Sequence, residues 1–198
     1  MTRKIIYLLL FIALLSCEQK KNDEICLGFQ LEEATLTDSL DYKIINTILD
    51  SIYADFKYIH IEQQTYSTVN LESLKSRLDR HNIKLDTILL QNYKSQNDQE
   101  YLLGDRFDQS NVHIITEEEN KCIFEKSSSP SWDNYYEKYP QSSGLYTFQR
   151  PGFNSKKNKA IIEYGWMAGP MTGEGYIVIL EKGDNGWKIT HRFVTWVS

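Results

Sequence analysis

The chain has 198 residues, of which 41% are hydrophobic and 25% are charged, and its formal net charge at pH 7 is −5. This length suits one domain that can bury a sizeable core. The acidic balance with scattered lysines argues against nucleic-acid binding, which requires a basic surface.

The first 16 residues resemble a bacterial lipoprotein signal peptide. Arg3 and Lys4 supply the positive charge, and the apolar run 5–15 is too short to span a bilayer, which takes about 20 residues. The run ends in Leu14-Leu15-Ser16-Cys17, which resembles a lipobox. We therefore expect cleavage before Cys17 and a diacylglyceryl group on its sulfur, and each buried methylene of that group contributes about 0.8 kcal/mol to anchoring. The alternative is an ordinary secretory signal with a chance cysteine.

Residues 17–24 form a hydrophilic segment after the expected cleavage site. We interpret them as a lipidated tether that joins the membrane to the folded part of the chain. The start at Gln19-Lys20 and the acidic end also look like the surface-export signal of Bacteroidetes lipoproteins. We therefore expect a lipid-anchored protein of the bacterial cell envelope, with the outer membrane as its site and both the periplasmic side and the cell surface open.

Two cysteines, Cys26 and Cys122, remain beside the lipidated one. In an oxidising envelope they could form one disulfide, which would join the N-terminal segment to the body of the domain. Two buried thiols are the alternative, and the sequence does not decide between them.

The clearest predicted helix covers residues 39–55. Thr37 or Ser39 can cap its N-terminus, and an apolar stripe recurs at helical spacing. The stripe, which is typical of a helix that packs against a core, comprises Leu40, Ile44, Ile45, Ile48, Leu49, Ile52 and Phe56.

Shorter elements follow in the N-terminal two thirds. Asn70 can cap a second helix that carries Leu71, Leu74 and Leu78, and a third helix is expected near residues 86–95. Strands are expected at 57–62, 111–116 and 121–124. Residues 117–120 are interpreted as a turn, and residues 102–110 and 126–131 as loops.

The last third is dense in aromatic, glycine and β-branched residues and predicts an antiparallel sheet. Its strands are expected at 145–149, 159–166, 176–181 and 187–197. The sequence Gly183-Asp184-Asn185-Gly186 is typical of a tight hairpin. Residues 176–180 are apolar on both faces, which predicts a central strand covered on both sides.

The final strand alternates between two faces. Trp187, Ile189, His191 and Phe193 are expected to share one of them. With helices before and strands after, residues 25–198 are predicted to form a single α+β domain, in which N-terminal helices pack on a C-terminal antiparallel sheet.

From Trp132 onward the chain resembles a family of uncharacterised Bacteroidetes lipoproteins and secreted proteins. The matching stretches are Trp132-Asp133-Asn134-Tyr135-Tyr136-Glu137-Lys138-Tyr139-Pro140, Ser143-Gly144, Arg150-Pro151-Gly152-Phe153-Asn154, Lys159-Ala160, Gly173-Glu174-Gly175-Tyr176, Gly186-Trp187-Lys188 and Trp196-Val197-Ser198. The resemblance implies an α+β envelope protein. It implies no activity and no catalytic residues.

Motifs for common chemistry are absent from the sequence, which contains no HExxH, no CxxC and no Walker lysine. We therefore predict no metal, no cofactor and no catalytic residue. The aromatic cluster Trp132, Tyr135, Tyr136, Tyr139 and Tyr146 is expected to build core, with a recognition patch as the alternative.

Two loops are the candidate contact sites for a ligand or partner. In the first, Arg150 could bind a carboxylate, or it could hold a loop carbonyl or an acidic neighbour, and Asn154 follows it. The second is the glycine-rich run 165–175, either a plain connection or a ligand lip with Trp166 as an aromatic floor. Glu163 would orient and activate His191 if the fold brought the two together, and a structural histidine is the alternative.

The leading hypothesis is a non-catalytic envelope lipoprotein that binds an unknown protein or small molecule. The first alternative is a small-molecule binder or enzyme with a cone-shaped fold similar to that of nuclear transport factors, and a pocket near Glu163, Trp166 and His191. The second is an immunity or accessory protein.

Overall fold

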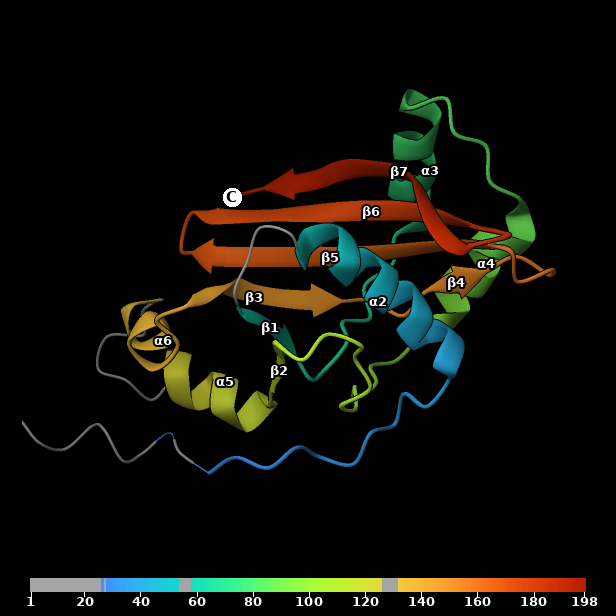
Figure 1. Cartoon of the computed structure of the whole chain (residues 1–198). Coiled ribbons are helices and arrows are strands. Elements are labelled where there is room, and N and C mark those ends of the chain that lie inside the picture. The colour runs from blue at the N-terminus through green and yellow to red at the C-terminus, as the bar shows by residue number, and fades with distance from the viewer. Residues whose placement is uncertain (1–25, 27, 54–57, 126–131) are drawn as a thin grey trace, which may run out of the picture.

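A curved, seven-stranded sheet forms the centre of the protein (Figure 1). The computed structural model describes residues 26, 28–53, 58–125 and 132–198. The strands follow one another across the sheet in the order β2-β1-β3-β5-β6-β7, and β4 pairs with β5 outside this path. Their bounds are β1 Tyr58–Glu62, β2 Val112–Ile115, β3 Ser142–Phe148, β4 Gly152–Phe153, β5 Lys159–Gly169, β6 Thr172–Gly183 and β7 Gly186–Val197.

The C-terminal strands are antiparallel, as expected, but the complete sheet is mixed. Strand β1 pairs in parallel with both β2 and β3, whereas β3, β5, β6 and β7 pair in antiparallel order. Parallel neighbours need long crossover connections, and the helical segments between these strands supply them. The expected α+β class is therefore confirmed, with a sheet that also takes two strands, β1 and β2, from the N-terminal two thirds of the chain.

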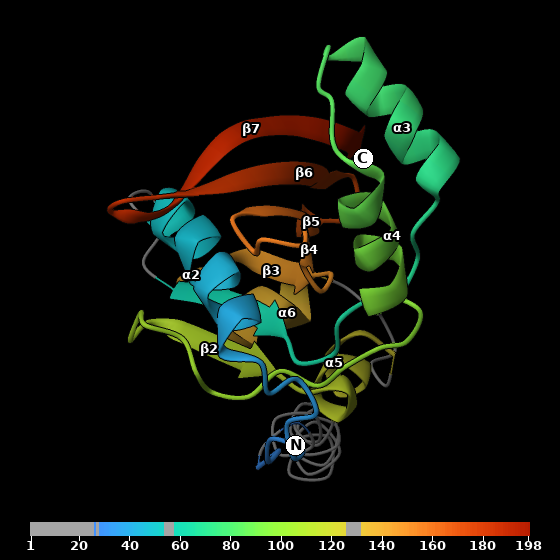
Figure 2. The ribbon, with the colours of Figure 1, turned by 90° about the vertical axis from the view of Figure 1, so that its right-hand side faces the viewer.

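Five helices in the described part of the chain cover the sheet in three groups. In Figure 2, α2 lies inside the curve of the sheet, and α3 and α4 lie on the opposite side. Helices α5 and α6 lie together near the end of the sheet that carries β1 and β2. Their bounds are α2 Ser39–Tyr53, α3 Leu71–Arg80, α4 Thr87–Gln96, α5 Glu117–Phe124 and α6 Trp132–Lys138.

Strand β6 separates two apolar cores. On the concave face, Val178 and Leu180 join the core that contains the α2 stripe, and on the other face, Ile177 and Ile179 join the core of α3 and α4. All four side chains are buried. The expected central strand, covered on both sides, is confirmed.

The predicted helix starts agree with the structure. Helix α2 begins at Ser39, and its apolar stripe is buried from Ile44 to Ile52, whereas Leu40 is half-buried and Phe56 lies outside the described residues. The Asn70 side chain accepts a hydrogen bond from the amide of Ser73, and Asp86 caps α4 in the same way through Leu89. Strands β1 and β2 also lie where the alternation of apolar residues predicts them.

Residues 117–124 form helix α5, so the expected turn and short strand there are wrong. The Thr116 hydroxyl accepts a hydrogen bond from the amide of Glu119 at 3.2 Å and caps the helix. Glutamates 117–119 occupy its first turn, where negative charge is stabilised by the helix dipole. Helix α6 was not predicted. It buries Tyr135 completely, so this part of the aromatic cluster is core.

Residues 165–175 are mostly strand, and the expected long loop is wrong. Strands β5 and β6 pair through this region down to Gly169 opposite Thr172. The glycines allow close packing: a Cβ on Gly175 would lie 2.0 Å from the Trp196 indole nitrogen, and one on Gly165 would lie 3.2 Å from the same ring system. The second hairpin, with Gly183 opposite Gly186, is confirmed.

A bulge in β7 changes the expected faces of the last strand. Leu180 pairs with Ile189, but its neighbour Ile179 pairs with His191, so one extra residue of β7 is accommodated there. Trp187 and Ile189 consequently pack on the concave core, and Phe193 packs on the opposite core. The prediction that all of these side chains share a face with His191 is wrong.

The remaining expectations concern segments that the structure does not describe. The expected signal peptide, the tether and the loop 126–131 lie outside the described residues. None of the described helices is long and apolar enough to cross a membrane.

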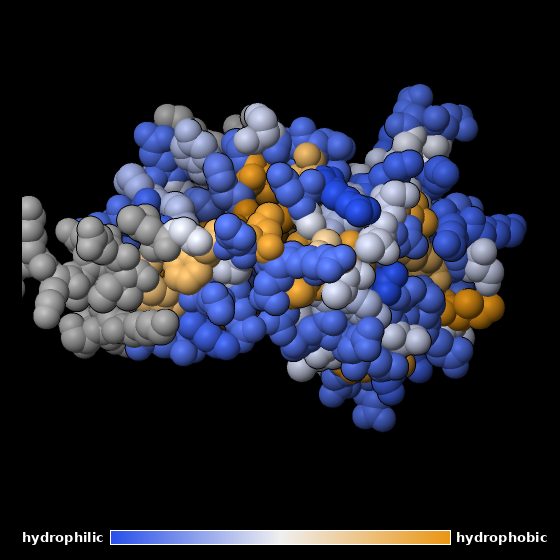
Figure 3. Space-filling view, turned by 90° about the horizontal axis from the view of Figure 1, so that it is seen from below, coloured by the Kyte–Doolittle hydropathy of each residue, from blue (hydrophilic) through white to orange (hydrophobic). Residues whose placement is uncertain are grey.

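Seen from below, the surface is mostly hydrophilic, and its apolar areas are small and separate (Figure 3). This face therefore offers no broad apolar surface for docking.

Candidate functional site

The structure does not bring Glu163, Trp166 and His191 together. Glu163 faces the side of α3 and α4, where it accepts a hydrogen bond from the Thr195 hydroxyl at 3.0 Å, and burial raises the pKa of its carboxyl. Trp166 packs against the concave core on the other face. His191 is exposed on the edge strand, and its Nδ1 lies 3.1 Å from the Thr190 hydroxyl. The pocket expected between these three residues is therefore not formed.

Arg150 and Asn154 have structural roles. The Arg150 Nε lies 2.6 Å from Asp41 Oδ2, and its guanidinium also lies 4.7 Å from the centre of the Tyr101 ring. Burial raises the pKa of the Asp41 carboxyl to about 6, an effect that Arg150 opposes. The Asn154 side chain bonds to Asn158 within its own loop. The sequence left two roles open for Arg150, and the structure shows the second one: Arg150 holds an acidic neighbour, Asp41.

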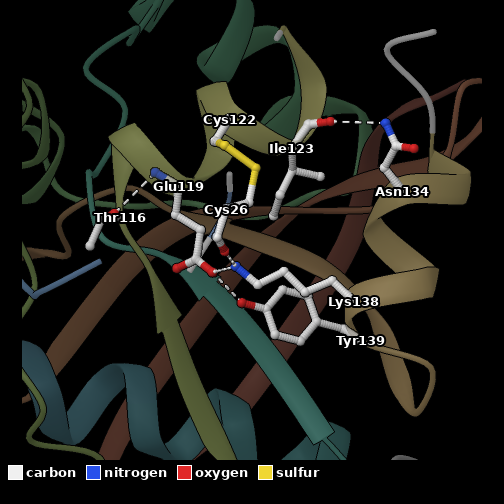
Figure 4. Close-up of a disulfide and its surroundings, with 8 residues drawn as sticks. All are labelled: Cys26, Thr116, Glu119, Cys122, Ile123, Asn134, Lys138 and Tyr139. Carbon is white, nitrogen blue, oxygen red and sulfur yellow. Dashed lines mark hydrogen bonds and ion pairs between the residues drawn. A yellow bond between two sulfur atoms is a disulfide. The ribbon is translucent and has the colours of Figure 1, made fainter. Parts of the chain in front are cut away.

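Cys26 and Cys122 form a disulfide, with their Cα atoms 5.8 Å apart (Figure 4). It joins the described residues before helix α2, namely 26 and 28–38, to helix α5, and we call these residues the N-terminal arm. The Lys138 ammonium donates a hydrogen bond to the Cys26 carbonyl at 2.6 Å and also pairs with the Glu119 carboxylate, which accepts from the Tyr139 hydroxyl. The arm is thus fixed to both α5 and α6 at one place.

A buried histidine lies next to a serine in the same region. His60 Nδ1 is 2.6 Å from the Ser142 hydroxyl, which also bonds to Tyr135 at 2.7 Å and to the backbone of Gly144. Burial lowers the pKa of His60 to about 4. Because the serine oxygen is surrounded by these partners, the pair is structural. His113 lies beside His60 across β1 and β2, and no group of three or more potential metal ligands occurs in the described part of the chain.

A pocket of about 240 Å³ opens on the concave face where helix α2 ends. It lies between the last turn of the helix and strands β3, β5, β6 and β7. We call it the aromatic pocket, and its lining residues are Ser51, Ile52, Tyr146, Tyr164, Trp166, Glu174, Tyr176 and Arg192. Of the five residues named as candidate contacts, Trp166 alone lines it; Glu174 belongs to the candidate run 165–175, and Tyr146 to the aromatic cluster.

Pairing between strands places the rings of the aromatic pocket side by side. Tyr146 is opposite Trp166 on the neighbouring strand, and Tyr164 is opposite Tyr176. The rings of Tyr164 and Tyr176 are stacked with centres 5.1 Å apart, and Phe148 stacks on the other side of Tyr164 at 5.6 Å. The Trp166 indole is fixed by donating a hydrogen bond to the Ser143 carbonyl at 2.8 Å.

Two opposite charges lie at the aromatic pocket. The Arg192 guanidinium is 5.9 Å from the centre of the Tyr164 ring and 6.0 Å from that of Tyr176, and it donates a hydrogen bond to the Ser51 hydroxyl. The Glu174 carboxylate accepts a hydrogen bond from the Tyr176 hydroxyl. The pocket therefore combines rigid rings with donors and acceptors of both charges.

Tyr146 and Tyr164 of the aromatic pocket are neutral at neutral pH. Burial raises the pKa of Tyr164, with Arg192 opposing the rise and Glu174 adding to it, and burial likewise raises the pKa of Tyr146 above its ordinary value. These hydroxyls are suited to donate and accept hydrogen bonds rather than to take up a proton. The Tyr164 side chain is only 2% exposed, and among the described residues its hydroxyl is not one of the buried polar atoms that lack a partner.

A second, smaller pocket of about 140 Å³ lies between the segment after β1 and the start of α5. It is acidic, with Glu62, Glu100 and Glu117 in its lining. The Glu62 carboxylate accepts a hydrogen bond from Asn120 at 2.8 Å, and Gln64 donates to Glu100. These groups satisfy one another, so this pocket is a weaker candidate.

Sequence reasoning missed most of the aromatic pocket. Tyr164 and Trp166 stand two residues apart on one strand, and Glu174 and Tyr176 do so on the next. That spacing, which places side chains on one face of a strand, was the available signal. The comparisons add no candidate residues, because the chain matches no family model, no curated protein and no solved structure.

Proposed function

We propose that the protein is a lipid-anchored binding protein of the bacterial envelope, and that the aromatic pocket is its ligand site. The observation that carries the binding role is the aromatic pocket itself, a space of about 240 Å³ whose walls combine three tyrosines and an indole with the Glu174 carboxylate and the Arg192 guanidinium. A ligand in this space could contact ring faces and charged hydrogen-bonding groups at the same time.

The walls of the aromatic pocket support binding rather than simple packing. The rings and the indole are fixed by stacking and by hydrogen bonds, so their positions are set before any ligand arrives. A preorganised site loses little conformational entropy on binding. Pockets with mostly aromatic walls and a few convergent polar groups are typical small-molecule sites.

The binding role can be tested with a thermal-shift panel of small molecules that includes neutral sugars, carboxylates, amines and planar aromatics. We expect a ligand that raises the melting temperature of the wild type to lose most of its effect in Arg192→Gln. The control is Lys188→Gln, an exposed basic residue on the same strand outside the pocket. Equal shifts in both variants would place binding elsewhere, and a panel without any stabilising compound would contradict the proposal.

The anchoring role rests on the lipobox-like sequence before Cys17 and on the resemblance to envelope lipoproteins. It needs its own test, because the pocket says nothing about anchoring. We expect cells that express the wild type to incorporate labelled palmitate into the protein, and Cys17→Ala to incorporate none. Equal labelling of the two would exclude lipidation at this cysteine.

A further inference from the structure

We infer that the ligand of the aromatic pocket is a neutral, polyhydroxylated ring, in chemical terms a sugar unit. This inference rests on the proposed binding function and adds the class of ligand. Three features of the pocket carry it: its size, its balance of charge, and the way in which its aromatic faces are already occupied.

The size of the aromatic pocket suits one small ring. Its volume is about 240 Å³, whereas pockets for drug-sized ligands usually have about 300–1,000 Å³. A fused polycyclic ligand or a nucleotide would exceed this space, and a single hexose ring would not. If the ligand is longer, one terminal unit would occupy the pocket.

The charges of the aromatic pocket favour a ligand without net charge. Glu174 and Arg192 lie on opposite sides of Tyr176 along the sheet, because Glu174 precedes it by two residues on β6 and Arg192 pairs with Val178, two residues after it. An anionic ligand would be attracted by the arginine and repelled by the glutamate, and a cationic ligand would meet the reverse. Neither an anionic nor a cationic ligand therefore gains a clear advantage over a neutral ligand.

The aromatic faces are largely occupied by one another, which disfavours a planar aromatic ligand. Tyr164 is stacked between Phe148 and Tyr176, and the Arg192 guanidinium lies near Tyr164 and Tyr176. A flat ligand would find no pair of free parallel faces to enter. The polar atoms that remain are a phenol, a carboxylate and a guanidinium, which together both donate and accept hydrogen bonds, as sugar hydroxyls also do.

Saturation-transfer difference NMR on the full lipidated protein can test this inference, in a zwitterionic detergent that has no sugar headgroup. The probes are the methyl glycosides of glucose, galactose and mannose, together with glucuronate, glucosamine and benzamide. We expect transfer to at least one neutral glycoside and less to its charged relatives. We also expect Tyr164→Phe to weaken that binding about five- to tenfold, because it removes one hydrogen bond and keeps the ring.

Two further variants keep the test decisive. Tyr66→Phe is the matched control, because Tyr66 lies outside the aromatic pocket, and it should bind the glycoside like the wild type. Arg192→Gln changes an exposed side chain, so it provides a second test if Tyr164→Phe is poorly folded; it should also weaken binding.

The outcomes separate the inference from the proposed function. Transfer to charged probes or to benzamide alone, lost in Arg192→Gln, would overturn the sugar inference and leave the pocket as a ligand site. Glycoside binding that Tyr164→Phe and Arg192→Gln leave unchanged would overturn it as well. No transfer to any probe, with no stabilising compound in the thermal-shift panel, would overturn both.

Discussion

The disulfide is the interaction whose removal should change stability most clearly. Cys26 and Cys122 are separated by 96 positions in the sequence. A link that closes a loop of about 100 residues lowers the entropy of the unfolded chain enough to stabilise the fold by about 4.7 kcal/mol in the chain-entropy description. Replacing both cysteines by alanine should therefore lower the free energy of unfolding by several kcal/mol.

The folded state should survive this change. The arm has further attachments beyond the disulfide: the amides of Thr35 and Leu36 donate to the Leu102 carbonyl at 3.0 Å, and Tyr42 donates to the Leu36 carbonyl at 3.0 Å. Only the first few described residues of the arm depend on the disulfide for their position. The double variant should thus keep the far-UV circular dichroism spectrum of the wild type while unfolding at a lower denaturant concentration.

Guanidinium titration of wild type and double variant, each with and without reductant, measures the effect. Reductant should shift the wild type to the midpoint of the variant and leave the variant unchanged. A difference below about 1 kcal/mol would refute the loop-entropy argument for this protein. Two free thiols in the denatured, unreduced wild type would refute the disulfide itself.

Three further predictions concern buried groups. The pKa of His60 falls from 6.5 to about 4 on folding, so the unfolded chain binds more protons between these pH values. Acidification from pH 6.5 to 4 should therefore cost about 3 kcal/mol of stability, and His60→Gln should flatten this dependence in urea titrations. Arg150→Ala leaves the Asp41 carboxylate buried and unpaired and should cost about 3–5 kcal/mol, more at pH 8 than at pH 5, where protonation removes the charge; equal losses at both would contradict the ion-pair argument. Gly175→Ala should destabilise by about 1–3 kcal/mol through overlap with Trp196, and a much smaller effect of the same substitution in a Trp196→Ala background, measured by thermal unfolding, would support this cause.

The regular elements were predictable where one periodicity dominated. The α2 stripe repeats at helical spacing, and Asn70 and Asp86 are strong caps, so local chemistry and the tertiary environment agree. The strands from residue 159 onward are rich in β-branched residues and have little competing pattern. Segments such as these can be interpreted from local sequence alone.

Prediction failed where local and tertiary signals conflict. Three consecutive glutamates look like a solvated turn, but after Thr116 they also suit the first turn of a helix. The glycines of 165–175 look like loop residues, because the sequence does not show that the Trp196 side chain packs against them from a neighbouring strand. In the first case the deciding residue, Thr116, is adjacent in the sequence and its capping role was overlooked, whereas in the second the deciding partner, Trp196, lies on another strand.

The candidate site was harder to predict than the fold, because it depends on register. Glu163 and Trp166 are three residues apart in one strand, which places them on opposite faces. His191 is displaced by a bulge that local sequence does not indicate. Arg192 reaches the aromatic pocket only because the same bulge pairs it with Val178 on the concave side. A shift by one residue reverses every face assignment after it.

The aromatic pocket itself follows from a difference in length between helix α2 and strand β6. Helix α2 has 15 residues and spans about 22 Å, whereas β6 has 12 residues and spans about 40 Å, so the strand extends roughly 17 Å further. One end of the concave face therefore continues past the helix, as Figure 1 shows for β5 and β6. The alternation of each strand continues there, but the apolar stripe of α2 no longer lies above it. Aliphatic side chains would be left facing water, and the chain instead has Tyr164 and Tyr176, whose rings stack on each other, and Trp166, whose indole donates a hydrogen bond to the Ser143 carbonyl.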